Sequence, residues 1–500
     1  MSWNTFFVVA LVLLTVSLVR PDGPKRAFYL MTALLPATGF FVDVGISLSA
    51  SKVIGLILSM FLLRFWVTHG VSGKAQSLGF VFLIYAAVVT ITGWLFAPVS
   101  SLESNEFRVL MRPAVQWLAL TLQMLPLFLA PHILRSKADV AATVKAFFWG
   151  SGLLALGGVL QWAVYSIWAV DIFPINREGL FGDVFESSGF EIGEDIIFRA
   201  KSLAREPKDM GTALVIAFTI WLLLRSAGMI RSFALSCVFV GTLLMAIVFS
   251  FSTTASFLLC VGVVALFIAS ITRVWIGSRK ATEIIRVIPV GHAVLFPGTL
   301  MKPAATVLFL GMITLASFLW YDSIQGLVPF ISDIVALRVG DRIGVIEDYD
   351  QVALDFLMNE PHWGIIGVGA GNLPWYGFSY LPSDPDSYFM QNLSWNAKSG
   401  LLLMVTSYGL MGLVVLILIL GAVVAILLAA LHRCKNAENL PILVAIISVG
   451  FISTVHAFRS VDETFWLALG LAVAYARTHS TSAQESQPVC SQTVAQPQTI

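Results

Sequence analysis

Charged residues are scarce in this chain, and their scarcity identifies its broad class. Aspartate, glutamate, lysine and arginine together make up 12 % of the 500 residues, whereas 58 % are hydrophobic. Soluble domains contain about 25 % charged residues. The composition therefore excludes an ordinary soluble protein and predicts an integral membrane protein.

Cysteine is also rare, and ionisable groups are few in the middles of the apolar segments. The four cysteines are Cys237, Cys260, Cys434 and Cys490, and none lies in either of the two long polar segments described below. This excludes a disulfide framework. No Cys/His spacing suggests a structural zinc site. Ion-coupled transporters usually bury ionisable groups along their pathway, which disfavours transport.

Apolar segments of about 20 residues are long enough to cross a bilayer, and the chain contains many. Three of them are short, so the sequence predicts an all-α polytopic membrane protein with 12 or 13 transmembrane helices. The expected spans are 4–19, 28–42, 53–67, 78–97, 113–131, 144–170, 210–224, 232–250, 254–272, 303–321, 399–430, 441–457 and 462–476.

Basic residues are distributed unevenly between the two alternating sets of loops. One set holds 18 of the 30 basic residues and only five acidic ones, which predicts that it faces the cytoplasm. The N-terminus is then outside, and two long polar loops, about 171–209 and 322–398, face outward. We expect one membrane domain over 1–477 and a disordered cytoplasmic tail over 478–500.

The second long loop has a recognisable internal order. Residues 346–360 alternate apolar and acidic side chains in the manner of an amphipathic helix. The run from Gly364 to Gly371 contains four glycines and is expected to form a turn-rich loop. As a nucleotide-binding signal the run is weak, because no strand–turn–helix context or P-loop lysine accompanies it.

Arginines in the two outward loops are candidate anion ligands. Arg338 and Arg342 are four residues apart and would share one face of a helix, while Arg199 and Arg205 lie just before the span at 210. The planar guanidinium fork suits a phosphate. Salt bridges to carboxylates within the same loops are the structural alternative for each arginine.

Two further residues are candidate general bases. Glu206 precedes Pro207 near the membrane surface, although the same residues also form an ordinary helix start. His362 is the one histidine in a long outward loop, and the usual histidine pKa suits proton abstraction near neutrality. A structural role is the alternative for both.

These motifs, in this order, resemble the O-antigen ligase and polymerase superfamily of bacterial envelope enzymes. The resemblance covers about 195–415 and is carried by short segments in a fixed order. They are Arg199-Ala-Lys-Ser202, Glu206-Pro207, the serine-rich Ser250-Phe-Ser-Thr-Thr254, the pair Arg338 and Arg342 with the amphipathic segment after it, Glu360-Pro-His-Trp-Gly-Ile-Ile-Gly-Val-Gly-Ala-Gly-Asn372, and Tyr408-Gly-Leu-Met-Gly412.

The resemblance implies a metal-independent glycosyltransferase of the bacterial inner membrane that needs no cofactor. Such an enzyme takes a glycan from undecaprenyl diphosphate on the outer side of the membrane. It implies that Arg199, Arg205, Arg338 and Arg342 bind the diphosphate, with His362 or Glu206 as the catalytic base. Expected partners are the lipid-linked glycan, membrane lipid, and flippase and chain-length regulator proteins, with no nucleic acid.

One departure from the family pattern bears on the reaction. Ligases place a His-Asn pair just before the Gly-Leu-Leu-Gly span, whereas this chain has Ser394-Trp-Asn-Ala-Lys398 there. This favours a polymerase of capsule, exopolysaccharide or O-antigen, with an O-antigen ligase as the alternative. A polyprenol-glycan flippase or other transporter is the alternative of another class, and a non-catalytic scaffold of an export complex is a third.

Overall fold

The structure is a computed structural model, and its description covers most of the helical part of the chain. The described residues are 22–39, 41–43, 47–69, 73–98, 107–173, 189–192, 195–204, 206–226, 233–250, 252, 254–262, 348–381, 396–397, 399–433, 446–450, 452–454 and 463–485.

Helices dominate the described residues. They are α2 (Gly23–Leu34), α3 (Ala50–His69), α4 (Lys74–Leu95), α5 (Phe107–Ile133), α6 (Lys137–Trp168), α7 (Pro207–Ser226), α8 (Phe233–Phe249), α13 (Asp348–Asn359), α14 (Pro361–Ile366), α15 (Leu373–Tyr376), the short 3-10 helix η2 (Phe378–Tyr380), α17 (Gly400–Arg433) and α19 (Glu463–Glu485).

Four of these helices are long and apolar enough to cross a membrane: α4, α6, Met111–Ile133 of α5 and Gly400–Ala430 of α17. The protein is therefore a mostly helical chain with the helices of a membrane protein. Helices α3, α7, α8 and α19 also coincide with expected spans. The expected spans 4–19 and 303–321 lie outside the described residues.

The structure corrects two expectations and adds two short hairpins to the mostly helical fold. In the hairpins, β1 (Phe41–Asp43) pairs antiparallel with β2 (Ser47–Ser49), and β3 (Gly189–Ile192) with β4 (Asp195–Phe198). The expected span 28–42 is not a single helix, since α2 ends at Leu34. Helix α19 continues to Glu485, past the expected start of a disordered tail at 478, and the rest of that tail lies outside the described residues.

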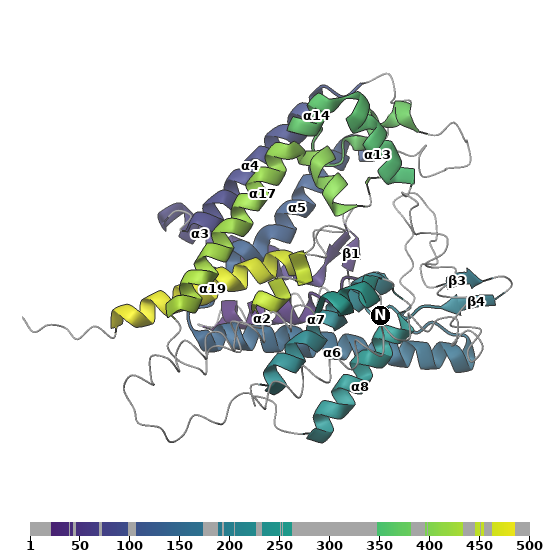
Figure 1. The fold of residues 1–500 in the computed structure, drawn as a ribbon, viewed down its shortest axis with the longest axis vertical. Coiled ribbons are helices and arrows are strands. Elements are labelled where there is room, and N and C mark those ends of the chain that lie inside the picture. Colours follow the sequence, from purple (N-terminus) through teal and green to yellow (C-terminus); the bar gives the residue numbers. More distant parts are fainter. Residues whose placement is uncertain are drawn as a thin grey trace, which may run out of the picture.

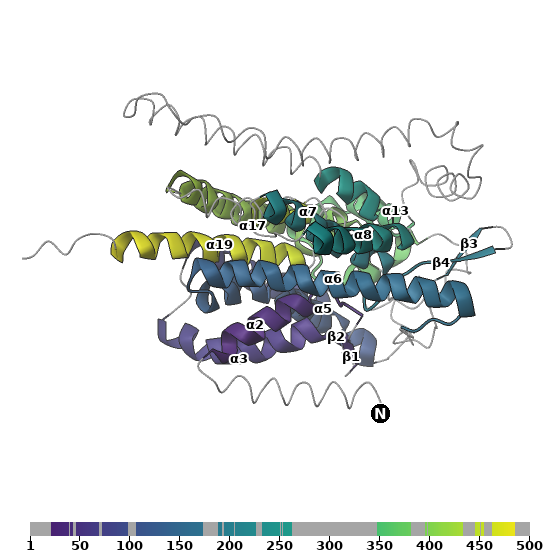
Figure 2. The same cartoon turned by 90° about the horizontal axis from the view of Figure 1, so that it is seen from below.

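The helices pack in layers. Figure 2 shows α2 and α3 on one side of α6 and α19, with α7, α8 and α17 on the other side. In Figure 1, α13 and α14 lie at one end of the group formed by α4, α5 and α17. A single large apolar core joins the long helices, and a second, smaller cluster under α13 includes Val352, Phe356 and Leu373.

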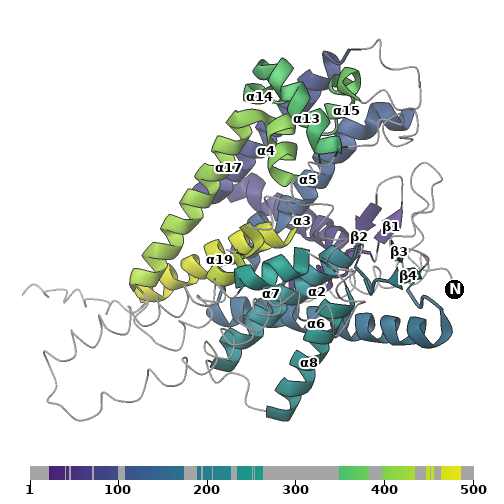
Figure 3. The ribbon, with the colours of Figure 1, turned by 45° about the vertical axis from the view of Figure 1, so that its right-hand side comes forward.

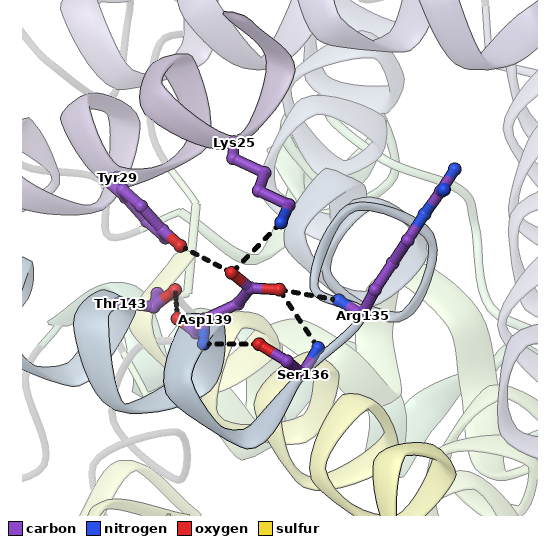
Figure 4. A network of polar contacts seen from close by, with 6 residues as sticks. All are labelled: Lys25, Tyr29, Arg135, Ser136, Asp139 and Thr143. Atoms are coloured by element: carbon purple, nitrogen blue, oxygen red, sulfur yellow. Dashed lines mark hydrogen bonds and ion pairs between the residues drawn. The ribbon is translucent and has the colours of Figure 1, made fainter. Parts of the chain in front are cut away.

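Helix α6 begins at a polar network that also holds α2 (Figure 4). The Ser136 side chain accepts from the Asp139 backbone N–H, and the Asp139 carboxylate accepts from the Ser136 N–H, which forms a capping box. The same carboxylate accepts from the Tyr29 hydroxyl at 3.2 Å and pairs with the Lys25 ammonium at 3.2 Å. Two helices distant in sequence are thereby joined at one end.

Three more polar contacts join α19 to early helices. At the start of α19, Glu463 accepts from the Ser51 hydroxyl at 2.8 Å and pairs with Lys52 at 3.4 Å. Further along α19, Arg477 donates to the Gln76 side chain at 2.9 Å. The uneven distribution of loop charge assigns one side of the membrane to the contacts of Lys25, Asp139, Gln76 and Arg477. It assigns the other side to the contact between Lys52 and Glu463.

Candidate functional site

The structure describes three of the six predicted site residues: Arg199, Glu206 and His362. Arg205, Arg338 and Arg342 lie outside the described residues. Arg199 and Glu206 belong to one segment that connects β4 to α7, whereas His362 belongs to α14. Figures 1 and 3 show α14 and α7 in separate parts of the molecule, so the two candidate bases are not brought together.

The segment 199–204 packs against the end of α8 and Ser250. The Ala200 N–H donates to the Phe249 carbonyl at 2.9 Å, and the Arg199 Nε–H donates to the Ser250 carbonyl at 3.4 Å. These contacts create a compact polar site at the end of α6, here called the polar junction. Its members are Gln161, Asp171, Arg199, Lys201, Ser202 and Ser250.

Gln161 organises the polar junction. It is fully buried in α6, and its Oε1 accepts from the backbone N–H groups of both Lys201, at 3.0 Å, and Ser202, at 2.6 Å. Its Nε2 donates to the Asp171 carboxylate at 2.7 Å. Because a buried amide must have its donors and acceptors satisfied, this one side chain fixes the path of the segment 201–202.

Lys201 is a buried cation at the centre of the junction. The residue is only 2 % exposed. Burial lowers the pKa of the Lys201 ammonium, and attraction to Asp171 opposes that shift. The junction therefore holds a positive charge in a poorly solvated place, where a charge interacts more strongly with its neighbours than it would in water.

Ser202 has an unusual backbone and an unusual side chain. Its φ is +52°, a left-handed conformation that non-glycine residues rarely adopt. The residue is 1 % exposed, and within the described part of the chain its hydroxyl makes no hydrogen bond. A Cβ added at Gly157 would collide with that hydroxyl oxygen, so α6 leaves room for it only by having a glycine there.

Glu206 occupies the start of α7, as the helix-start interpretation predicts. Its carbonyl accepts from the Asp209 and Met210 N–H groups, and its carboxylate pairs with Lys208 at 2.7 Å. The carboxylate is partly exposed rather than buried. Its geometry therefore combines a structural role with access for a substrate.

His362 is an exposed side chain on α14. Its Nδ1 lies 3.6 Å from the Glu360 carboxylate, and its ring lies against that of Trp363. An exposed imidazole beside a carboxylate can accept or release a proton. Of the predicted diphosphate ligands the structure describes Arg199 alone, and it belongs to the segment before α7, away from α14 (Figures 1 and 3).

The glycine run is a packed structural element rather than a phosphate cradle. The chain is helical to Ile366, which corrects the expectation of a loop from Gly364, and then turns through Gly367, Gly369 and Gly371 with φ of +90°, +90° and +73°. The N–H groups of Val368 and Gly369 donate to the carbonyls of Thr406 and Ser407 in α17, both at 2.8 Å. These amides are not available to a phosphate.

The sequence did not single out Gln161 or Asp171. The available signal is that Gln161 is a glutamine inside a long apolar helix, where a polar side chain needs a partner. The described residues contain no group of three His, Cys, Asp or Glu side chains that could hold a metal ion. No protein-family model and no curated protein matches the chain.

Proposed function

We propose that this protein is a polysaccharide polymerase of the bacterial inner membrane. It transfers glycan repeat units from undecaprenyl diphosphate on the outer side of the membrane to an acceptor glycan. A metal-independent glycosyltransferase needs a cationic site for the diphosphate, a catalytic base and a membrane-embedded body. The proposal assigns the first of these to the polar junction and the outward arginines.

One observation carries the proposal: sequence segments that resemble the polymerase family, although far apart in the chain, meet in pairs. Arg199-Ala-Lys-Ser202 contacts the turn at Ser250 through the two hydrogen bonds described above. The glycine run contacts the α17 segment around Tyr408 through Val368 and Gly369. Paired packing of this kind supports the assignment of these segments to one functional unit.

In the proposed reaction, an acceptor hydroxyl attacks the anomeric carbon of the donor. A C–O bond forms there, the bond to the diphosphate oxygen breaks, and the diphosphate leaves with the electron pair. Arg199, Arg205, Arg338 and Arg342 neutralise the leaving group, where each charge-assisted hydrogen bond contributes about 1.5–3 kcal/mol. Glu206, which lies in the same connection between β4 and α7 as Arg199, accepts the hydroxyl proton.

The test is Arg199→Gln in the native host, with Lys145→Gln as the control because Lys145 is an exposed cation on α6 away from the junction. Surface polysaccharide is compared by gel, and the protein level by immunoblot. Single repeat units on the lipid carrier, at a normal protein level, are the expected result for Arg199→Gln alone. Long unattached chains would indicate a ligase, and unchanged polymer would exclude the role of Arg199.

A further inference from the structure

The glycine run and α14 lie along the outer half of α4 rather than above it. Tyr376 donates from its hydroxyl to the Gly93 carbonyl at 2.7 Å, near the end of α4. The Ala370 N–H donates to the Thr90 hydroxyl at 3.0 Å, about one turn deeper. The Tyr85 hydroxyl donates to the Ile366 carbonyl at 2.7 Å, deeper again.

Tyr85 lies well inside the apolar part of α4. Trp94, which is 43 % exposed near the end of this helix, is the type of residue that marks a membrane interface. Tyr85 precedes it by nine residues, or about 13 Å along the helix axis. Between the two positions Val88 and Ile91 are exposed apolar side chains, as expected of a surface in contact with lipid.

Several backbone groups of this segment have protein partners, which irregular chain inside a bilayer requires. Val368 and Gly369 donate to α17, Ala370 donates to Thr90, and the Val368 carbonyl accepts from the Asn372 side chain at 2.8 Å. The left-handed glycines allow the close approach, since a Cβ at Gly367 would lie 2.5 Å from the Ser407 carbonyl oxygen.

Helix α14 presents an apolar face that no described residue covers. Ile365 and Ile366 are 54 % and 48 % exposed. Ile365 lies against Gly409 of α17 through its carbonyl, and the next residues of α17, Leu410 and Met411, are themselves exposed apolar side chains. The face of α14 is thus continuous with the exposed apolar faces of two candidate membrane spans.

We propose that α14 and the glycine run form a re-entrant element, which enters the bilayer from the outer side and turns back within it. The occupant of the α14 face is the acyl-chain region of the membrane lipid, in contact with Ile365 and Ile366. Glu360 and His362, at the start of α14, then lie at the depth of the lipid headgroups. This placement holds whatever reaction the protein performs.

The test measures the membrane depth of single nitroxide labels in the full-length protein. Cys237, Cys260, Cys434 and Cys490 are replaced by serine, and one cysteine is introduced as Ile365→Cys or Ile366→Cys. The labelled protein is placed in phosphatidylcholine–phosphatidylglycerol vesicles. Collision rates with oxygen, which concentrates in lipid, and with a water-soluble nickel chelate are compared with those at Leu410→Cys and Gln351→Cys.

The re-entrant element predicts that labels at 365 and 366 collide several times more often with oxygen than with the chelate, as at Leu410. Two other results would overturn it. Access to the chelate equal to that at Gln351, an exposed residue of α13, would place α14 in water. Little access to either reagent at both positions would show that protein covers the face. The two positions provide independent readings if one variant folds poorly.

Discussion

At the scale of single residues, the polar junction depends on one glutamine. Gln161 accepts two backbone N–H groups from the segment 201–202 and donates to Asp171, so it sets both the backbone and the charge of the site. Lys201 and Ser202 are buried as a consequence. Their burial was not predictable from the sequence, because the partner that fixes them lies 40 residues earlier, on α6.

The burial of Lys201 makes the free energy of unfolding depend on pH in the alkaline range. Because its folded pKa is lowered, the unfolded chain binds the proton more readily as the pH falls below the ordinary lysine pKa of about 10.4. The stabilising contribution is therefore present above that pH and is lost as the pH falls through the folded pKa. Thermal midpoints of the wild type and Lys201→Met, measured in detergent, should show the wild type gaining on the variant from pH 7.5 to 10.5.

Asp171→Asn provides the control for this pH dependence. Without the carboxylate, nothing in the Gln161–Asp171 pair opposes the effect of burial on Lys201, so the rise in thermal midpoint with pH should be steeper than in the wild type. A constant difference between wild type and Lys201→Met over the whole range would contradict the buried-cation interpretation.

Asp139 offers a second prediction at this scale. Its carboxylate has partners on α2 and at the start of its own helix. Asp139→Ala therefore removes a helix cap and leaves the Lys25 ammonium and the Tyr29 hydroxyl without this partner. We expect it to lower the free energy of unfolding by about 1–3 kcal/mol. Tyr29→Phe removes one hydrogen bond and should cost less, about 0.5–1.5 kcal/mol. Urea unfolding followed by tryptophan fluorescence ranks the two, and equal losses would contradict the shared network.

At the scale of elements, the length of the apolar segments predicted the long helices well. The ranges that it predicted wrongly have identifiable causes. For α4, α5, α6 and α17, most of the expected first and last residues lie within a few residues of those in the structure. The range 28–42 was wrong because Pro36 and Gly39 follow the end of α2, and the chain then pairs β1 with β2. The length and hydropathy of an apolar segment alone do not predict such a turn.

Helix α17 is interrupted where the glycine run meets it. Gly409 has φ +65° and ψ −177°, so the helix bends there and offers the carbonyls of Thr406 and Ser407 to the glycine run. The sequence showed the glycines of both motifs but not their contact. Glycine spacing indicates where a backbone turns, whereas the surface that it turns against depends on tertiary packing.

Gly369→Ala tests this contact. A Cβ there would lie 2.7 Å from the Val89 carbonyl oxygen, in a left-handed backbone with φ +90°. Strain and overpacking together should lower the free energy of unfolding by about 2–4 kcal/mol. Gly364→Ala is the matched control, because its nearest neighbour would be the Leu357 side chain at 3.6 Å. It should be neutral or slightly stabilising. Comparable losses in the two variants would show that the run is not tightly packed.

At the scale of the whole molecule, the polar contacts between helix ends agree with the alternation predicted from loop charge. Lys25 with Asp139 and Gln76 with Arg477 join ends assigned to one side, and Lys52 with Glu463 joins ends assigned to the other. The structure thus shows which ends lie together. Which of the two sides faces the cytoplasm stays a prediction from the positive-inside rule.

Labelling from one side of the membrane tests that orientation. In a chain whose four cysteines are replaced by serine, Gln351→Cys and Ala138→Cys place exposed single thiols on the two predicted sides. A membrane-impermeant maleimide should label Gln351→Cys in intact spheroplasts, and Ala138→Cys only after permeabilisation. The reverse pattern would invert the assigned topology.

The contacts of α19 have a consequence for how the protein is made. Glu463 holds Ser51 across 412 residues, and Arg477 holds Gln76 across 401. Because a chain is synthesised from its N-terminus, α3 and α4 are inserted long before the residues that hold their ends exist. The early helices therefore remain incompletely packed in the bilayer until nearly the whole chain has been synthesised. A nascent chain halted before Glu463 would accordingly be a substrate for membrane quality control.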